Sequence, residues 1–162
     1  MIKLVRIDHR LLHGQVVFAW VNRLNINRII VVDDVAANDE FKKMSLKLAK
    51  PNDVKLNIFA VEDALNRKEK IKNLQENVAV IFGNTKNCLA FCKELTGEIK
   101  EINYGGIPKK TDSIEYDKAV YLNAEELEDS KKLKALGFRL YSQQTPTNAL
   151  IELNDKFKKK GC

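Results

Sequence analysis

The sequence predicts an α/β fold of three layers, with helices on both faces of a mainly parallel central sheet. Strand patterns alternate with helix patterns along all 162 residues, as they do in chains that build such sheets. Two strand patterns, residues 28–32 (RIIVV) and 78–82 (VAVIF), are apolar throughout, which is typical of strands buried on both faces. No repeat or linker interrupts the alternation, so we expect a single domain over residues 1–162.

The first half of the chain supplies the remaining evidence for a sheet that begins at the N-terminus. Residues 2–7 alternate apolar and polar side chains, and residues 54–60 (VKLNIFA) form another strand pattern. Helices are expected over residues 14–24, 36–49 and 61–74. The second of these helices stops before Pro51, and we expect Asn38 to be its N-cap. Asp33 and Asp34 end a buried strand, where they can face solvent or cap the next helix.

The second half continues the same alternation. Strands are expected over residues 98–104, 118–122 and 138–143. Helices are expected over residues 86–95, 125–136 and 147–159. Gly83-Asn84 and Gly105-Gly106 follow strands, so they are either simple turns or part of the lining of a site.

Composition limits the classes of function. The net charge is +6 and the pI about 9.2, which favours an acidic or phosphorylated partner. The positive charge is spread along the chain, and its densest run, residues 156–160, is not interleaved with aromatic side chains, so we do not expect nucleic-acid binding. No apolar run approaches the ~20 residues of a membrane span, and the charged N-terminus does not resemble a signal peptide, so we expect a cytoplasmic protein.

The sequence offers no cofactor motif. It contains neither G-x-x-x-x-G-K-[ST] nor G-x-G-x-x-G, the two common phosphate-binding loops of nucleotide sites, and it lacks a G-x-S-x-G nucleophile elbow. Cys88 and Cys92 are spaced i,i+4 and Cys162 ends the chain, with no second Cys/His pair to complete a zinc site. We therefore expect no metal, no cofactor, and cysteines that are inert or partly buried thiols.

Both histidines of the chain lie in one window, residues 6–15 (RIDHRLLHGQ), directly after the first strand. If that strand is central, the window lies at the carboxyl edge of the sheet, where open α/β sheets bind their ligands. His13 then starts a helix, whose N-terminus favours anions, and Gly14 leaves room for a close approach. Arg10 can hold a phosphate by two parallel hydrogen bonds.

This set of side chains suits a histidine that carries a phosphoryl group, because an imidazole is a sound nucleophile near neutral pH. Arg6 can add charge, and Asp8 can orient a ring nitrogen or Arg10. Three other interpretations compete with it on the residues alone. His9, His13 and Asp8 could bind a metal, a phosphatase R-H-G motif would need arginine where Leu12 stands, and both histidines could be structural.

The window resembles the signature of the IIB subunits of the mannose/fructose/sorbose class of the bacterial sugar phosphotransferase system. Other blocks of the chain resemble the same family in the same order: RIIVVDDVAANDE (28–40), INYGGIP (102–108), KAVYL (118–122) and QQTPT (143–147). The resemblance thus spans nearly the whole chain. It implies a mainly parallel sheet of about seven strands.

The resemblance also implies a function. His13 would accept a phosphoryl group from a phosphohistidine of a IIA protein and pass it to a sugar held by the IIC and IID membrane subunits. Arg10 would bind the phosphate. Further candidates for binding the phosphate, or for supporting the residues that bind it, are Asp8, Arg6, Gly14, Gln15, Asn84, Gly105 and Gly106. The protein would be a transferase at the inner face of the membrane, associated with it through IIC and IID.

Some questions stay open on the sequence. His9 departs from the acidic or small residue that many members of the family carry there, so we assign it no catalytic role. A regulatory or binding module that kept the fold without the transfer is the alternative function. The sugar, a hexose or an amino sugar, is not specified, and the oligomeric state is open, a homodimer included.

Overall fold

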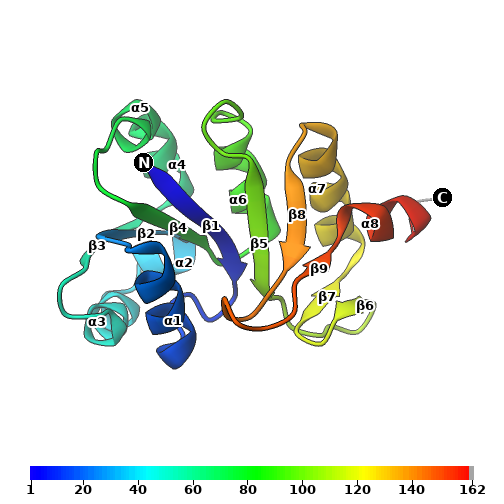
Figure 1. Ribbon diagram of the computed structural model, residues 1–162, viewed down its shortest axis with the longest axis horizontal. Helices are drawn as coiled ribbons and strands as arrows, with labels where there is room; N and C mark the ends of the chain where they lie inside the picture. Colours follow the sequence, from blue (N-terminus) through cyan, green and yellow to red (C-terminus); the bar gives the residue numbers. More distant parts are fainter. Residues whose placement is uncertain (161–162) are drawn as a thin grey trace.

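The computed structural model describes residues 1–160 of the chain, with side chains placed for residues 1–157; Cys162 lies outside the described residues. Its centre is a seven-stranded sheet of order β3-β2-β4-β1-β5-β8-β9, in which only β9 runs antiparallel to its neighbour (Figure 1). The strands of this sheet are β1 (Ile2–Asp8), β2 (Arg28–Val32), β3 (Lys55–Phe59), β4 (Val78–Phe82), β5 (Glu101–Gly106), β8 (Arg139–Ser142) and β9 (Ile151–Glu152). The predicted fold class is therefore confirmed.

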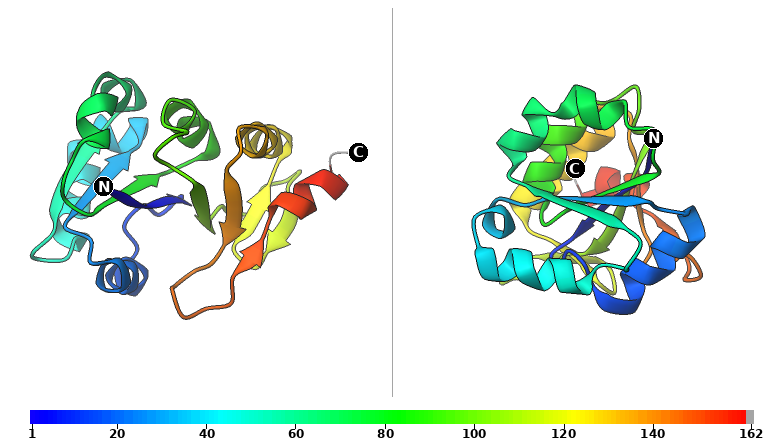
Figure 2. Two further views of the ribbon diagram at one scale, coloured as in Figure 1. Left: turned by 45° about the horizontal axis from the view of Figure 1, so that its top comes forward. Right: turned by 90° about the vertical axis from the view of Figure 1, so that its left-hand side faces the viewer.

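Helices cover both faces of the sheet (Figure 2). One face carries α1 (Gly14–Leu24), α2 (Asp34–Ala37) and α3 (Glu40–Ala49). The other face carries α4 (Val61–Asn66), α5 (Lys68–Lys72), α6 (Thr85–Cys92), α7 (Ala124–Ala135) and α8 (Asn154–Lys160). Because successive side chains of a strand point to opposite faces, β4 supplies Val80 and Phe82 to one apolar core and Ala79 and Ile81 to the other.

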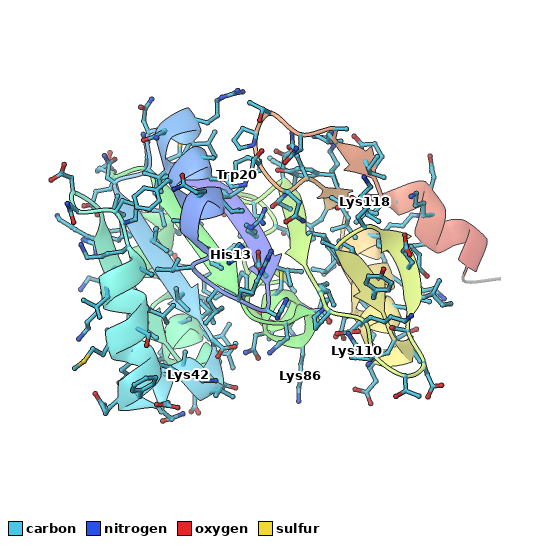
Figure 3. All side chains as sticks on the ribbon, turned by 90° about the horizontal axis from the view of Figure 1, so that it is seen from below. His13, Trp20, Lys42, Lys86, Lys110 and Lys118 are labelled. Atoms are coloured by element: carbon cyan, nitrogen blue, oxygen red, sulfur yellow. The ribbon has the colours of Figure 1, made fainter. Side chains whose placement is uncertain are left out.

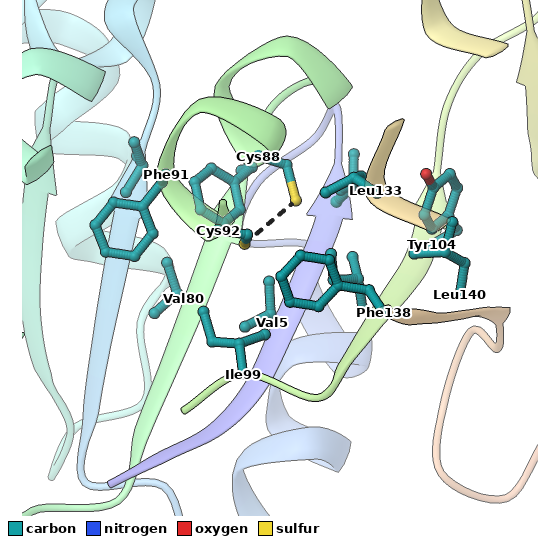
Figure 4. Close-up of a cluster of buried hydrophobic side chains, with 14 of the residues drawn as sticks. Val5, Val80, Cys88, Phe91, Cys92, Ile99, Tyr104, Leu133, Phe138 and Leu140 are labelled. Atoms are coloured by element: carbon teal, nitrogen blue, oxygen red, sulfur yellow. Dashed lines mark hydrogen bonds between the residues drawn. The ribbon is translucent and has the colours of Figure 1, made fainter. Parts of the chain in front are cut away.

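The larger core contains the two thiols of α6 (Figure 4). Cys88 and Cys92 are fully buried, and their sulfur atoms lie 3.8 Å apart as free cysteines. Burial, with Cys92 beside it, raises the pKa of the Cys88 thiol well above its usual range, so the thiolate does not form at neutral pH. The structure confirms that both thiols of this pair are free and buried.

The seventh strand of the sheet is not the one that the sequence predicts. Residues 118–122 were expected to join it, but β7 (Val120–Leu122) pairs with β6 (Ile114–Asp117) in a separate antiparallel hairpin. The seventh strand is β9, inside the expected helix 147–159, which begins only at Asn154. Polar turn chemistry replaces the first half of that helix, because Asn148 Oδ1 accepts hydrogen bonds from the Thr145 backbone (3.0 Å) and hydroxyl (2.7 Å).

Two other predicted helices are each split in two. The helix expected over residues 36–49 becomes α2 and α3, and the N-cap of α3 is Asp39 rather than Asn38. Asp39 accepts from the backbone N–H groups of Phe41 and Lys42, whereas the Asn38 amide donates to the Asp34 carbonyl at 2.8 Å. Asp33 caps α2, as one of its two interpretations predicted. The helix expected over residues 61–74 is likewise divided into α4 and α5.

The topology fixes where a ligand site can form. β1 is the central strand of the sheet, with β4 on one side and β5 on the other. The chain moves in one direction from β1 to β2 and returns to the opposite side with β5, so the carboxyl end of β1 is a topological switch point. The loop that follows β1, residues 9–13, lies there with both histidines.

Candidate active site

His13 is exposed at the N-terminus of α1 (Figure 3). It is the N-cap residue, with an extended backbone, and its carbonyl accepts the first helical hydrogen bond from Val16 at 3.0 Å. Its side chain does not cap the helix, and no acidic residue lies in the first turn. His13 therefore stands at a helix end where unpaired backbone N–H groups and the helix dipole favour an anion.

The loop that presents His13 has an unusual backbone. Gly14 has φ +41°, and nothing lies within 4 Å of the position that a Cβ atom would take there. Leu11 has φ +60°, which is costly for a leucine, while Leu12 is buried beneath the loop. Backbone strain of this kind clusters at ligand sites, which makes the loop a candidate for one.

Asp8 fixes the arginine of this loop. Its carboxylate is fully buried and accepts three hydrogen bonds from Arg10: from the backbone N–H (3.0 Å), from Nε (3.0 Å) and from Nη2 (3.1 Å). Nη1 of Arg10 donates to none of the described residues, and the side chain is 32% exposed. Arg10 is thus held in one orientation, with Nε and Nη2 bound to Asp8 and Gln144 and the N–H groups of Nη1 free to donate charge-assisted hydrogen bonds to an anion.

Arg6 lies beneath the ion pair of Asp8 and Arg10. Only 2% exposed, it donates Nη2 to Asp8 at 3.1 Å and Nη1 to the Gln143 carbonyl at 3.0 Å and to the Asn103 side chain. Burial raises the pKa of Asp8, but the hydrogen bonds from Arg10 and the charge of Arg6 outweigh it and hold that pKa below its usual range. Arg6 supports Asp8, which orients Arg10.

Gly105 and Gly106 end β5 and do not form a turn. A Cβ atom on Gly105 would overlap the Arg6 guanidinium, and one on Gly106 would lie 2.9 Å from Asp8 Oδ1 and 3.0 Å from Arg10 Nη2. The two glycines therefore make room for the ion pairs behind the loop. They act on the site through Arg6, Asp8 and Arg10.

We expect Gly105→Ala to destabilise the protein by about 1–3 kcal/mol, the usual cost of forcing extra atoms into a packed interior. Gly97→Ala is the matched control, because a Cβ atom there meets nothing within 4 Å and the backbone is not left-handed. Urea denaturation followed by circular dichroism measures both. Equal midpoints for the two variants would show that Arg6 does not need the space beside Gly105.

Two predicted residues lie at the edge of the site without joining its network. Asn84 is exposed and caps α6 through the backbone N–H of Asn87 at 2.8 Å. Its neighbour Gly83 packs against the Asp33 carboxylate and approaches Leu11, which places Asn84 beside the loop. Gln15 is exposed on the first turn of α1, and its side chain makes no hydrogen bond to the described residues.

Gln144 is a site residue that the prediction missed. Its side chain accepts from Arg10 Nη2 at 3.4 Å and donates to the Gly105 carbonyl, and its own carbonyl accepts from Trp20 Nε1 at 2.8 Å. It follows β8, so the rule that places ligands at the carboxyl edge could have identified it. It joins Arg10, β5 and α1 at a single point.

His9 differs from His13 in its surroundings. Its backbone N–H donates to the Gly106 carbonyl at 2.9 Å, which ties the start of the loop to β5. Partial burial lowers the pKa of His9, and the charges of Arg10 and Lys110 act in the same direction against the opposing charge of Asp8. His9 is therefore mostly neutral at pH 7. Among the described residues, no cluster of three or more His, Cys, Asp or Glu side chains could hold a metal ion.

Comparison with known proteins gives the family. A profile described as "PTS system sorbose subfamily IIB component" matches residues 2–162. A probable phosphotransferase enzyme IIB component of Streptococcus pyogenes serotype M6 is 31% identical, over 95% of this chain and 98% of that protein. The mannose-specific EIIAB component of Escherichia coli K12 is 30% identical, over 98% of this chain and 49% of that longer protein.

Solved structures agree with this result. The crystal structure of the IIBSor domain of the sorbose permease from Klebsiella pneumoniae superposes with a TM-score of 0.89, at 29% sequence identity, over 98% of this chain and 97% of that one. No helix among the described residues has the length and apolar character needed to cross a membrane. Fold, profile and relatives agree, and the chain belongs to the sorbose subfamily of IIB components, the sugar phosphotransfer proteins of the phosphotransferase system.

Proposed function

We propose that His13 is the phosphoryl carrier of this transferase. One observation carries the proposal. His13 is exposed at a helix N-terminus, three residues after Arg10, and the buried carboxylate of Asp8 holds Arg10 so that the N–H groups of its Nη1 remain free. In the first half-reaction, a nitrogen of His13 attacks the phosphorus of a donor phosphohistidine, and the P–N bond of the donor breaks. In the second, a sugar hydroxyl attacks the phosphorus, the P–N bond to His13 breaks, and the released imidazole gains, on balance, the proton that the hydroxyl loses.

Each part of the site has a task in this scheme. Arg10 holds the equatorial oxygens of the transferring group and stabilises their charge in the transition state. The first N–H groups of α1, opened to approach by Gly14, bind the same anion. Asp8 and Arg6 orient Arg10, and Gly105 and Gly106 give them space.

The partners follow from the family. The donor is a IIA protein or domain, and the Escherichia coli relative carries both components in one chain by its name, EIIAB. The acceptor is a sugar, a hexose or an amino sugar, held by IIC and IID membrane subunits, through which the protein would be placed at the membrane. Lys86 and Lys110 lie on the same side of the molecule as His13, so an acidic donor surface would complement it (Figure 3).

The test is incubation with phosphoenolpyruvate and the general phosphotransferase proteins, with and without a IIA protein. We expect one phosphoryl group per chain, dependent on IIA, labile in acid and stable in base, as a phosphohistidine is. Binding of IIA without any labelling would instead support the non-transferring module. Binding to DNA that falls steeply with salt would support the nucleic-acid alternative.

We expect Arg10→Ala to slow transfer by about 10²–10³-fold, the usual effect of removing one donor that stabilises transition-state charge. Arg10→Lys should recover only part of the rate, because a single ammonium group cannot pair with Asp8 as Nε and Nη2 do and also take the place of Nη1 toward the anion. Rapid-quench measurement of transfer from phosphorylated IIA gives both rates. Arg23→Ala, at the far end of α1, is the control with an unchanged rate. An Arg10→Ala rate equal to wild type would remove Arg10 from the site.

A further inference from the structure

Helix α3 carries an apolar stripe on the side that faces solvent. Phe41 is 79% exposed, Met44 63% and Leu48 82%. Their spacing of three and four residues places them on one face of the helix, and the buried Leu46 lies on the opposite face, toward the core. A surface helix normally presents polar side chains outward, so this outer face is unlike that of an ordinary helix of a globular protein.

Lysines border the stripe on its two sides. At 3.6 residues per turn, Lys47 lies about 60° around the helix from Met44, and Lys42 lies about 100° from Phe41 on the other side; both are exposed. Neither has a carboxylate partner within the described part of the chain. The acidic residue of the helix, Glu40, sits in the first turn and pairs with Lys43 at 3.5 Å. The outer face of α3 thus combines apolar side chains with free positive charge.

We propose that the outer face of α3 docks on the surface of an anionic lipid bilayer. Phe41, Met44 and Leu48 would enter the boundary between headgroups and acyl chains, and Lys42 and Lys47 would meet the negative headgroups. The lysines favour lipid over the cytoplasmic loops of membrane proteins, because those loops carry an excess of Lys and Arg themselves. With three apolar side chains and two lysines, the binding is weak and reversible.

The position of α3 gives the docking a consequence for the site. Figure 3 views the molecule from the side of His13, and α3, with Lys42 labelled, lies at the margin of the same view. A bilayer in contact with α3 would therefore lie along the side of the molecule from which His13 is reached. The proposal stands on α3 alone and does not depend on the role of His13.

Flotation of the full chain with unilamellar vesicles tests the proposal. We expect binding to vesicles that contain phosphatidylglycerol, weaker binding to pure phosphatidylcholine, and loss of binding at high salt. Phe41→Ser with Leu48→Ser should lower binding to both kinds of vesicle by roughly tenfold or more. Lys42→Gln with Lys47→Gln should lower binding to the anionic vesicles about tenfold and leave binding to the neutral vesicles unchanged. Leu136→Ser, an exposed leucine on the opposite side of the sheet, is the control with no effect.

Three results would overturn the proposal. These are no flotation of the wild-type chain, equal flotation of the wild type and both double variants, or a wild-type dimer in light scattering that Phe41→Ser with Leu48→Ser converts to monomer. The last result would assign the stripe to a second copy of the chain. IIA-dependent labelling of the same variants in solution should equal that of wild type, so a failure of flotation leaves the proposal for His13 intact, and a failure of labelling leaves the docking intact.

Discussion

His13→Ala should reduce phosphoryl labelling by IIA to background, whereas His9→Ala should keep one phosphoryl group per chain. The chain has two histidines, so the pair of variants tests every histidine that could carry the group. His13 stands at the helix N-terminus with its side chain uncommitted, while His9 contributes its backbone to β5. The alanine at position 9 leaves that backbone hydrogen bond in place.

Mass spectrometry of the intact chain, after incubation with the general phosphotransferase proteins and IIA, measures the stoichiometry. Circular dichroism must show that both variants are folded, which we expect because both side chains are exposed. Labelling of His13→Ala at the wild-type level would refute the assignment. A label that survived acid would point away from histidine, and the burial of Cys88 and Cys92 makes these thiols poor alternatives.

Asp8→Asn should destabilise the protein at neutral pH by about 3–5 kcal/mol, the usual effect of removing one partner from a buried ion pair. The substitution leaves the guanidinium of Arg6 in the interior without its counter-charge, and frees Arg10 from the carboxylate that holds its Nε and Nη2. Urea denaturation at pH 7 measures the change. Asp112→Asn is the matched control, because that carboxylate is exposed and pairs with none of the described residues; it should shift stability by less than about 0.5 kcal/mol.

The pH dependence of stability gives a second test of the ion pairs of Asp8. The pKa of Asp8 is lower in the folded protein than in the unfolded chain, so its contribution is fully present above the unfolded pKa of about 3.9 and is lost as the pH falls through the folded pKa. The difference in stability between wild type and Asp8→Asn should therefore stay constant from pH 7 to about pH 5 and shrink below about pH 4. A constant difference down to the acid limit would show that Asp8 is not the charged partner of the two arginines.

The sequence predicts the inner strands well because burial dictates them. A strand covered on both faces must be apolar throughout, as β2 and β4 are, and few other elements share that pattern. The edge of the sheet has no such constraint. β9 contains two residues, and its pairing with β8 depends on a turn held by Asn148, so neither periodicity nor length could reveal it. The strand expected over residues 118–122 was correct in type but wrong in its partner, since pairing is a tertiary property.

The same difference applies to the site. His13, Arg10 and Asp8 are neighbours in sequence, and local spacing was enough to bring them together in the prediction. The burial of Arg6 depends on Asn103 in β5 and on the carbonyl of Gln143, directly after β8, both far along the chain. The reason for Gly105 is likewise non-local, because its missing side chain makes room for Arg6. Local patterns are enough to propose the reacting groups, and only the folded structure shows what supports them.

The long-range bonds of the site set an order of events during synthesis. Arg6 and Trp20 donate to the carbonyls of Gln143 and Gln144, residues 137 and 124 positions further along the chain. A nascent chain can form β1, α1 and their neighbours early, but the loop that bears His13 keeps part of its framework open until these glutamines leave the ribosome. If His13 carries the phosphoryl group as proposed, a growing chain should become able to accept it only after Gln143 and Gln144 have emerged and these two bonds can form.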